Sequence, residues 1–258
     1  MNLNSVNFDT HYAAIYRAKS DFLKPVSELD EVSLSDLVGI EEQKAALMAN
    51  TQRFLKGRGF HHALLWGARG TGKSSLIKAV FNALKEQGLR LVQLDKADLH
   101  ALPELIDELR ALKHHFIVFC DDFSFENGDE SYKFLKPLLE GGIEKAPANI
   151  VLYASSNRRH LLAELDSDND GAFAAELHPG DIKEERLSLS DRFGLWLGFY
   201  QEGLQDYLKI VDFYFKDTAI FKKDKELLHA KARAFAALRA SRSGRTAKQF
   251  FVEFSQSL

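Results

Sequence analysis

The sequence is poor in the residues and segments that mark several classes of protein. Its 258 residues include one cysteine, Cys120, which excludes an intramolecular disulfide and a metal site built from several cysteines. No apolar run approaches the roughly 18 residues that a membrane-spanning helix requires. Lysine and arginine number 34 against 37 aspartates and glutamates, a net charge of −3, which argues against a histone-like nucleic-acid coat. Residues 1–10 lack a basic region followed by an apolar stretch, so we expect no signal peptide and a cytoplasmic location.

The composition is that of a globular protein with its own core. Hydrophobic residues make up 45% of the chain and charged residues 28%. Short apolar runs alternate with segments of helical spacing, which predicts a parallel α/β sheet. The expected strands are 62–66, 89–94, 116–120, 150–154 and 195–200, and the expected helices are 11–24, 41–56, 73–86, 102–112 and 132–139. Residues 204–258 have helical patterns only, so we expect a domain boundary near 201–203.

Charge is unevenly distributed along the chain. Residues 164–191 carry nine acids against two bases, and residues 222–248 carry nine bases against two acids. The two segments could attract each other within a chain or between chains, or they could be two solvated faces.

A glycine-rich segment between an expected strand and an expected helix matches the pattern G-x-x-x-x-G-K-[ST] in full. Glycines allow the backbone to turn tightly, so that successive N–H groups and a helix N-terminus face phosphate oxygens. The lysine would reach the β- and γ-phosphates, and the serine hydroxyl would bind Mg²⁺. The matching residues are Gly67, Ala68, Arg69, Gly70, Thr71, Gly72, Lys73 and Ser74.

A second part of this site is expected where the apolar strand 116–120 ends in Asp121 and Asp122. Asp121 would hold Mg²⁺ through its water shell, and Asp122 would act as general base on the attacking water. An aspartate pair after a strand can also be a helix cap or a turn. Cys120, inside the apolar strand, is interpreted as a buried residue rather than a nucleophile.

The chain resembles the AAA+ ATPases, and within them an uncharacterised bacterial family of predicted AAA+ ATPases. The resemblance covers nearly the whole chain from about residue 34. It rests on the segments Leu37–Ile40, Leu65–Leu76, Phe119–Glu126, Ser155–Leu161 and Leu187–Gly194.

The resemblance implies a five-stranded parallel sheet sandwiched by helices, over residues 37–202. A helical arm over 1–36 would precede it, and a helical lid over 203–258 would follow. Val38 and Gly39 match the turn that packs on adenine, and Ser75 continues the phosphate loop. Asn157 matches the first sensor, which orients water, and Arg245 matches the second sensor on the lid.

Arg192 matches the arginine finger that a neighbouring subunit presents, so the resemblance also implies an ATP-dependent homo-oligomer. The expected activity is Mg²⁺-dependent ATP hydrolysis, coupled to remodelling or loading of an unknown protein partner. Arg158 and Arg159 compete for catalytic or partner-contact roles.

Other interpretations stay open from the sequence. Asn157 could be a turn former, and Arg192 and Arg245 could be surface ion pairs. Most AAA+ proteins have Asp-Glu where this chain has Asp121-Asp122, so the chain could be a nucleotide-dependent switch or loader that hydrolyses little. A small-molecule kinase could use the same phosphate loop. Basic residues near the C-terminus could meet DNA phosphates, but a net acidic chain makes nucleic acid the less favoured partner.

Overall fold

The structure, a computed structural model, describes residues 6–125, 129–157, 191–201 and 203–255. Arg158, Arg159 and nearly all of the acidic segment 164–191 therefore lie outside the described residues. None of the described helices is long and apolar enough to span a bilayer.

Seven strands of the described residues form one sheet with the order β2-β1-β4-β5-β6-β3-β7. All neighbouring strands are parallel except β2, which pairs antiparallel with β1. The five strands expected from the sequence are all present, within one or two residues of the expected bounds. They are β3 (Ala63–Gly67), β4 (Leu89–Gln93), β5 (His115–Cys120), β6 (Ile150–Ser156) and β7 (Leu195–Phe199).

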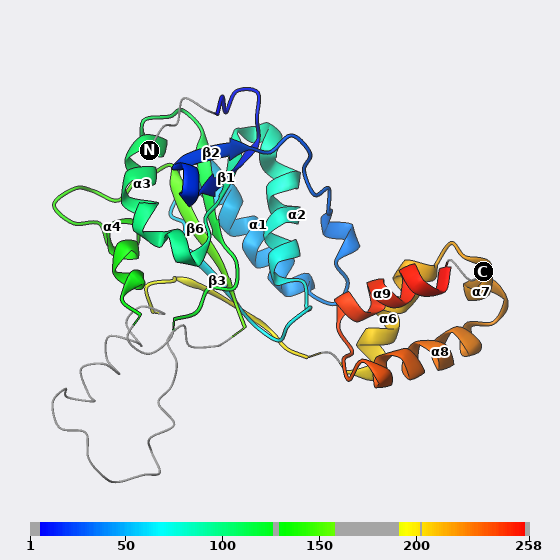
Figure 1. Ribbon diagram of the computed structural model, residues 1–258. Coiled ribbons are helices and arrows are strands. Elements are labelled where there is room, and N and C mark those ends of the chain that lie inside the picture. Colours follow the sequence, from blue (N-terminus) through cyan, green and yellow to red (C-terminus); the bar gives the residue numbers. More distant parts are fainter. Residues whose placement is uncertain (1–5, 126–128, 158–190, 202, 256–258) are drawn as a thin grey trace, which may run out of the picture.

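Helices cover both faces of this sheet (Figure 1). The helices α1 (Glu41–Leu55) and α2 (Lys73–Leu84) cover one face, and α3 (Leu102–Arg110) and α4 (Lys136–Leu139) cover the other. A mostly parallel sheet with helices on both faces, as the resemblance implied, is therefore the observed fold, and the sheet has seven strands rather than five.

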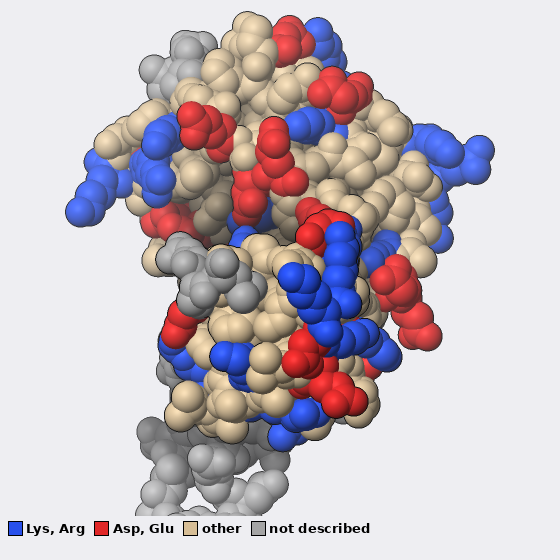
Figure 2. Space-filling model, turned by 90° about the vertical axis from the view of Figure 1, so that its right-hand side faces the viewer, with Lys and Arg blue, Asp and Glu red and all other residues tan. Residues whose placement is uncertain are grey.

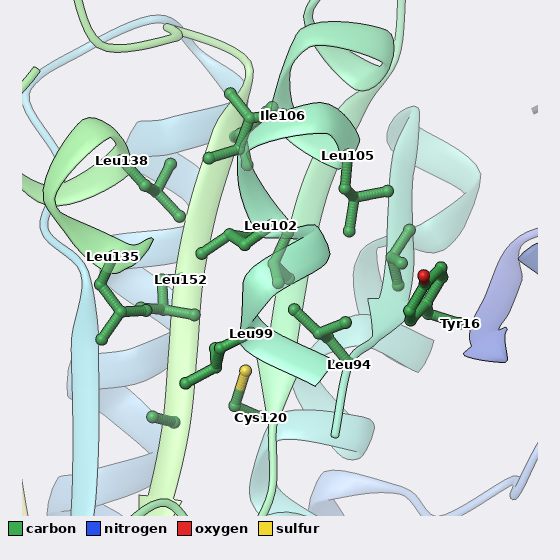
Figure 3. Close-up of a cluster of buried hydrophobic side chains, with 14 of the residues drawn as sticks. Tyr16, Leu94, Leu99, Leu102, Leu105, Ile106, Cys120, Leu135, Leu138 and Leu152 are labelled. Atoms are coloured by element: carbon green, nitrogen blue, oxygen red, sulfur yellow. The ribbon is translucent and has the colours of Figure 1, made fainter. Parts of the chain in front are cut away.

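Alternation along the central strands explains why both faces are apolar. In β5, Phe116 and Val118 pack on the side of α3, whereas Ile117 and Phe119 pack on the side of α1 and α2. Figure 3 shows the α3 side, where leucines from that helix and from the preceding 3₁₀ turn meet Cys120 and the strands. A strand that is buried on both faces needs such a continuous apolar run.

The prediction of a helix over 11–24, and with it a helical N-terminal arm, is wrong. This segment forms two strands, β1 (Ala13–Arg17) and β2 (Phe22–Pro25), with a turn at Asp21, which has a φ of 45°. Residues 12–16 are a short continuous apolar run, and periodicity alone does not tell whether such a run belongs to a helix or to a buried strand. Pairing with β4 decides between them, because β4 would otherwise leave its edge hydrogen-bonding groups open. The expected five-stranded sheet is thereby extended to seven strands.

The C-terminal segment forms only helices, which lie together beside the sheet (Figure 1). Their bounds are α6 (Leu204–Phe215), α7 (Ala219–Lys223), α8 (Lys225–Leu238) and α9 (Gly244–Ser255). They share a core of their own, which includes Tyr207, Phe215 and Phe250. We call these helices the lid. A division into domains over 37–202 and 203–258 stays our proposal.

Candidate nucleotide site

The glycine-rich segment 67–74, which we call the phosphate loop, joins β3 to α2, and its glycines adopt conformations that other residues avoid. Gly67 has a φ of 129°, and a Cβ there would overlap the backbone of Phe199 on β7. Gly70 has a φ of 76°, and a Cβ there would lie 2.7 Å from Oγ of Ser243 on the lid. These two glycines therefore allow the loop to lie close to β7 and to the lid at the same time.

Lys73, the first residue of α2, is buried under this loop with 6% of its surface exposed. Its ammonium group donates to the carbonyls of Gly67 (2.8 Å) and Ala68 (2.6 Å) and to Oδ1 of Asn157 (3.2 Å). Burial lowers the pKa of Lys73, although Asp121 and Asp122 partly oppose the shift. No ion pair to Lys73 is present in the described part of the chain, so its charge is only partly compensated.

Ser74 and Asp121 lie together, as the sequence predicted. Oγ of Ser74 donates to Oδ1 of Asp121 over 2.6 Å, so a serine hydroxyl and a carboxylate meet beside the phosphate loop. Within the described ranges, no group of three or more His, Cys, Asp and Glu side chains forms a complete metal site. Mg²⁺ does not require one, because it keeps several waters and takes one or two protein ligands together with substrate phosphates. The hard oxygen donors of Ser74 and Asp121 fit this ion.

Asp122 and Asn157 also contact each other. The amide Nδ2 of Asn157 donates to Oδ1 of Asp122 over 2.7 Å, while its Oδ1 accepts from Lys73. Asn157 therefore links the lysine of the phosphate loop to the second carboxylate. Such a bridge keeps the amide orientation fixed, because the two contacts require opposite ends of the side chain.

These side chains open into a cavity of about 850 Å³ between the sheet and the lid. Figure 2 shows acidic and basic side chains around the hollow between the sheet region and the lid. Of the residues expected at the site, the cavity is lined by Val38, Arg69, Gly70, Thr71, Gly72, Lys73, Ser74, Ser75, Asp121, Asp122, Asn157 and Arg245. Gly39, Gly67, Ala68 and Arg192 do not line it, although Gly67 and Ala68 hold Lys73 through their carbonyls.

Part of the cavity lining is apolar and aromatic. Leu37 and Val38 come from the connector before α1, and Phe213 and Tyr214 come from α6 of the lid. Burial, and secondarily the carboxylate of Asp36, raises the pKa of Tyr214, as expected where lid and connector approach each other. A flat apolar group such as a nucleobase fits between such walls.

The lid contacts the phosphate loop directly at the start of α9. The backbone N–H of Arg245 donates to the carbonyl of Gly70 over 3.3 Å. The side chains of Arg245 and, one turn further, Lys248 line the cavity. The lid thus adds two positive charges to the lining of the cavity.

Arg192 lies outside the cavity and pairs with Glu140. Its side chain is 23% exposed, and its Nη1 is buried without a hydrogen-bond partner in the described residues. The structure therefore does not bring Arg192 to the site of its own chain.

Several cavity residues were missed from the sequence. Asp30, Glu31, Phe213 and Tyr214 come from segments that carry no nucleotide-binding pattern, and only the fold brings them to the cavity. Lys248 lies three residues after Arg245, on the same helix. Ser155 was given no role, although it precedes Asn157 by two residues and alternation places both on one side of the strand. That spacing could have identified it.

Cys120 is fully buried in β5, as predicted, and burial raises the pKa of its thiol to about 12. A thiol that stays protonated and has no access to solvent is a packing residue.

A family model described as "Protein of unknown function (DUF815)" matches residues 9–258. No curated protein matches the chain. Two solved structures of RuvB from Thermotoga maritima, a Thr-to-Val variant and an Arg-to-Ala variant, are similar to it at 17% and 16% identity. Each covers 86% of this chain, and the chain covers 72% and 71% of theirs, with TM-scores of 0.49 and 0.46. Similarity at this level identifies neither function nor site residues.

Proposed function

We propose that this chain, which belongs to the family described as a protein of unknown function (DUF815), binds ATP with Mg²⁺ and hydrolyses it. The observation that carries the proposal is the environment of Lys73. Its ammonium group is buried at the phosphate loop without a carboxylate partner in the described residues, and its pKa is lowered by that burial. The negative charge of a nucleotide phosphate would compensate this charge.

The roles proposed from the sequence agree with the contacts of the side chains. Ser74 and Asp121 would hold Mg²⁺, which supplies charge neutralisation on the phosphates when bound. Asp122 would accept a proton from water, and Asn157, which donates to Asp122, would orient that water. Val38 and the aromatic residues of α6 would pack on the base, and Arg245 would contact the phosphates from the lid.

The coupling of hydrolysis to a macromolecular partner is also part of the proposal. Arg192 would act on the nucleotide of a neighbouring copy, since it lies away from the cavity of its own chain. We therefore propose an ATP-dependent homo-oligomer that remodels or loads a protein partner, with nucleic acid less favoured.

The experiment that tests the proposal compares Lys73→Ala with Lys56→Ala. Lys56 is exposed directly after α1 and does not line the cavity. Hydrogen bonds to charged groups contribute about 1.5–3 kcal/mol, so Lys73→Ala should weaken binding of ADP and of a non-hydrolysable ATP analogue by about 10- to 150-fold. Calorimetry with Mg²⁺ measures both, and Lys56→Ala should bind like the wild type.

Phosphate release from ATP, without any added acceptor, tests the reaction itself. We expect turnover with Mg²⁺ and none with EDTA. Binding without turnover would favour the nucleotide switch, and turnover only with a phosphate acceptor would favour a kinase. Unchanged affinity of Lys73→Ala would refute the assignment of the phosphate site.

A further inference from the structure

Ser155, near the end of β6, contacts the turn that carries both carboxylates of the site. Its Oγ donates to Oδ1 of Asp121 and lies 3.4 Å from the backbone N of Asp122, which donates to it. Its carbonyl oxygen accepts from the N–H of Phe123 over 2.6 Å. One residue of the neighbouring strand therefore holds three consecutive residues after β5.

The turn at these residues is tight. Asp122 has a φ of 50°, a left-handed conformation in which aspartate is tolerated better than most side chains. The direction of the Asp122 carboxylate depends on that conformation, and the conformation depends on the contacts of the turn with β6. Ser155 is 2% exposed and sits on a buried strand, so its position is set by the sheet.

The contacts of Asp121 are asymmetric. Its Oδ1 accepts from Oγ of Ser74 at 2.6 Å, from Oγ of Ser155, and from the N–H of Asp122 at 3.1 Å. Its Oδ2 has no hydrogen bond or ion pair within the described part of the molecule, and Asp121 lines the cavity. Three donors on one oxygen fix the rotation of the carboxylate and leave the other oxygen available to a cation or to its water shell.

We propose that Ser155 is a positioning residue for Mg²⁺, acting through Asp121, and that it sets the direction of Asp122 through the same turn. The inference rests on the proposed function, because it names a further residue of the same site. Groups that hydrogen-bond to a metal ligand fix the orientation of that ligand, and their loss costs about 10- to 100-fold in metal affinity or activity.

The chain offers a matched control in Ser156, the next residue of β6. Ser156 is also a fully buried serine, but alternation turns its side chain to the opposite side of the strand. Loss of either hydroxyl can lower stability, whereas only loss of the Ser155 hydroxyl should affect Mg²⁺.

The experiment measures binding of ADP over a range of Mg²⁺ concentrations and again in EDTA, for the wild type, Ser155→Ala and Ser156→Ala. We expect Ser155→Ala to raise the Mg²⁺ concentration for half-maximal response by about 10- to 100-fold and to leave the affinity in EDTA unchanged. Ser156→Ala should respond to Mg²⁺ like the wild type. Ser155→Thr, which keeps the hydroxyl, should restore most of the response.

A second variant covers the case in which Ser155→Ala does not fold. Ser155→Cys keeps nearly the same shape but has a weak donor, and it should shift the Mg²⁺ response in the same direction. An unchanged Mg²⁺ response of a folded Ser155 variant, or an equal loss of affinity in EDTA, would overturn the positioning role alone. A wild type whose nucleotide binding ignores Mg²⁺ would overturn the proposed function and this inference with it.

Discussion

The two walls of the cavity hold their polar side chains in different ways. On the sheet wall, Lys73, Asp121 and Asn157 each take part in hydrogen bonds to neighbouring groups. On the lid wall, Arg245 and Lys248 have no side-chain hydrogen bond or ion pair among the described residues, and the backbone of Arg245 supplies the contact to Gly70.

This difference leads us to expect different roles for the two walls. Groups that stabilise a transition state are most effective when they are already oriented, because no reorganisation is needed during the reaction. The sheet wall meets this condition. The lid wall carries long cationic side chains on helices with a separate core, and these can adjust when a nucleotide enters. Chemistry is therefore expected from the sheet and nucleotide retention from the lid.

The largest expected effect belongs to a residue on neither wall, Arg192. If a second copy completes the site, Arg192→Ala should lower ATP hydrolysis by about 10³- to 10⁵-fold while nucleotide binding stays normal. The reason is that the guanidinium would meet the charge that develops on the transferred phosphoryl group. Mixing this variant with Lys73→Ala should restore some activity, since each supplies what the other lacks at one interface.

Glu140→Gln is the matched control for Arg192, because it removes the carboxylate that pairs with the guanidinium and leaves Arg192 in place. It should retain activity. Activity per subunit that stays constant over a hundredfold dilution, without rescue on mixing, would mean that the two walls of one chain make the whole site.

The next effect tests the sheet wall itself. Asp122→Asn keeps the size of the side chain and the tolerance for a left-handed backbone but removes the base. Hydrolysis should fall by about 10²- to 10⁴-fold with Mg²⁺-dependent binding retained, measured by single-turnover phosphate release and by calorimetry. Lost binding would instead place Asp122 among the ligands of the metal.

A third prediction concerns how the stability of the folded chain depends on pH through a histidine beside the sheet. His62, just before β3, accepts from the N–H of Leu152 over 3.0 Å, and burial lowers its pKa to about 4. The unfolded chain therefore binds a proton that the folded chain does not, and stability is lost as the pH falls from 6.5 towards 4. The full shift corresponds to at most about 3 kcal/mol.

The measurement is thermal unfolding of the wild type and His62→Gln at pH 7 and pH 4.5. The variant should be less stable at pH 7 but should lose less stability on acidification. His229→Gln, which removes a lid histidine paired with Asp212, leaves His62 in place and should keep the acid sensitivity. Equal acid sensitivity in wild type and His62→Gln would assign the effect to other groups.

The smallest effect concerns the lid wall. Arg245→Ala should weaken nucleotide binding by roughly tenfold, the lower end for a hydrogen bond to a charged group, with little change in hydrolysis of bound ATP. Arg242→Ala, three residues earlier and outside this cavity, should leave the affinity unchanged in the same titration. A larger effect of Arg245→Ala on hydrolysis than on binding would give the lid a part in the chemistry.

Much of the fold could be predicted because its signals are local. The glycines of the phosphate loop, the apolar run before Asp121 and the alternation of strands with helices each occupy a few consecutive residues. The five strands and the closeness of Ser74 to Asp121 followed from them. The roles assigned to the site residues stay predictions.

Other features could not be predicted, since they depend on contacts between distant segments. The apolar run at residues 12–16 does not by itself distinguish a helix from a buried strand, and pairing with β4 selects the strands. Tyr214 and Lys248 reach the cavity only because the lid lies over the phosphate loop. Arg192 forms an ion pair with Glu140, and no local sequence pattern indicates that pair.

The sequence by itself determined which segment forms the glycine-rich loop and which strand ends in the two carboxylates, because backbone freedom and burial are properties of short segments. Tertiary structure alone decided which side chains orient these groups. Ser155 acts on Asp121 and Asp122 from the next strand, and the lid contacts Gly70 from the far end of the chain. Both contacts form because packing brings distant residues within hydrogen-bonding distance, which the order of residues along the chain does not specify.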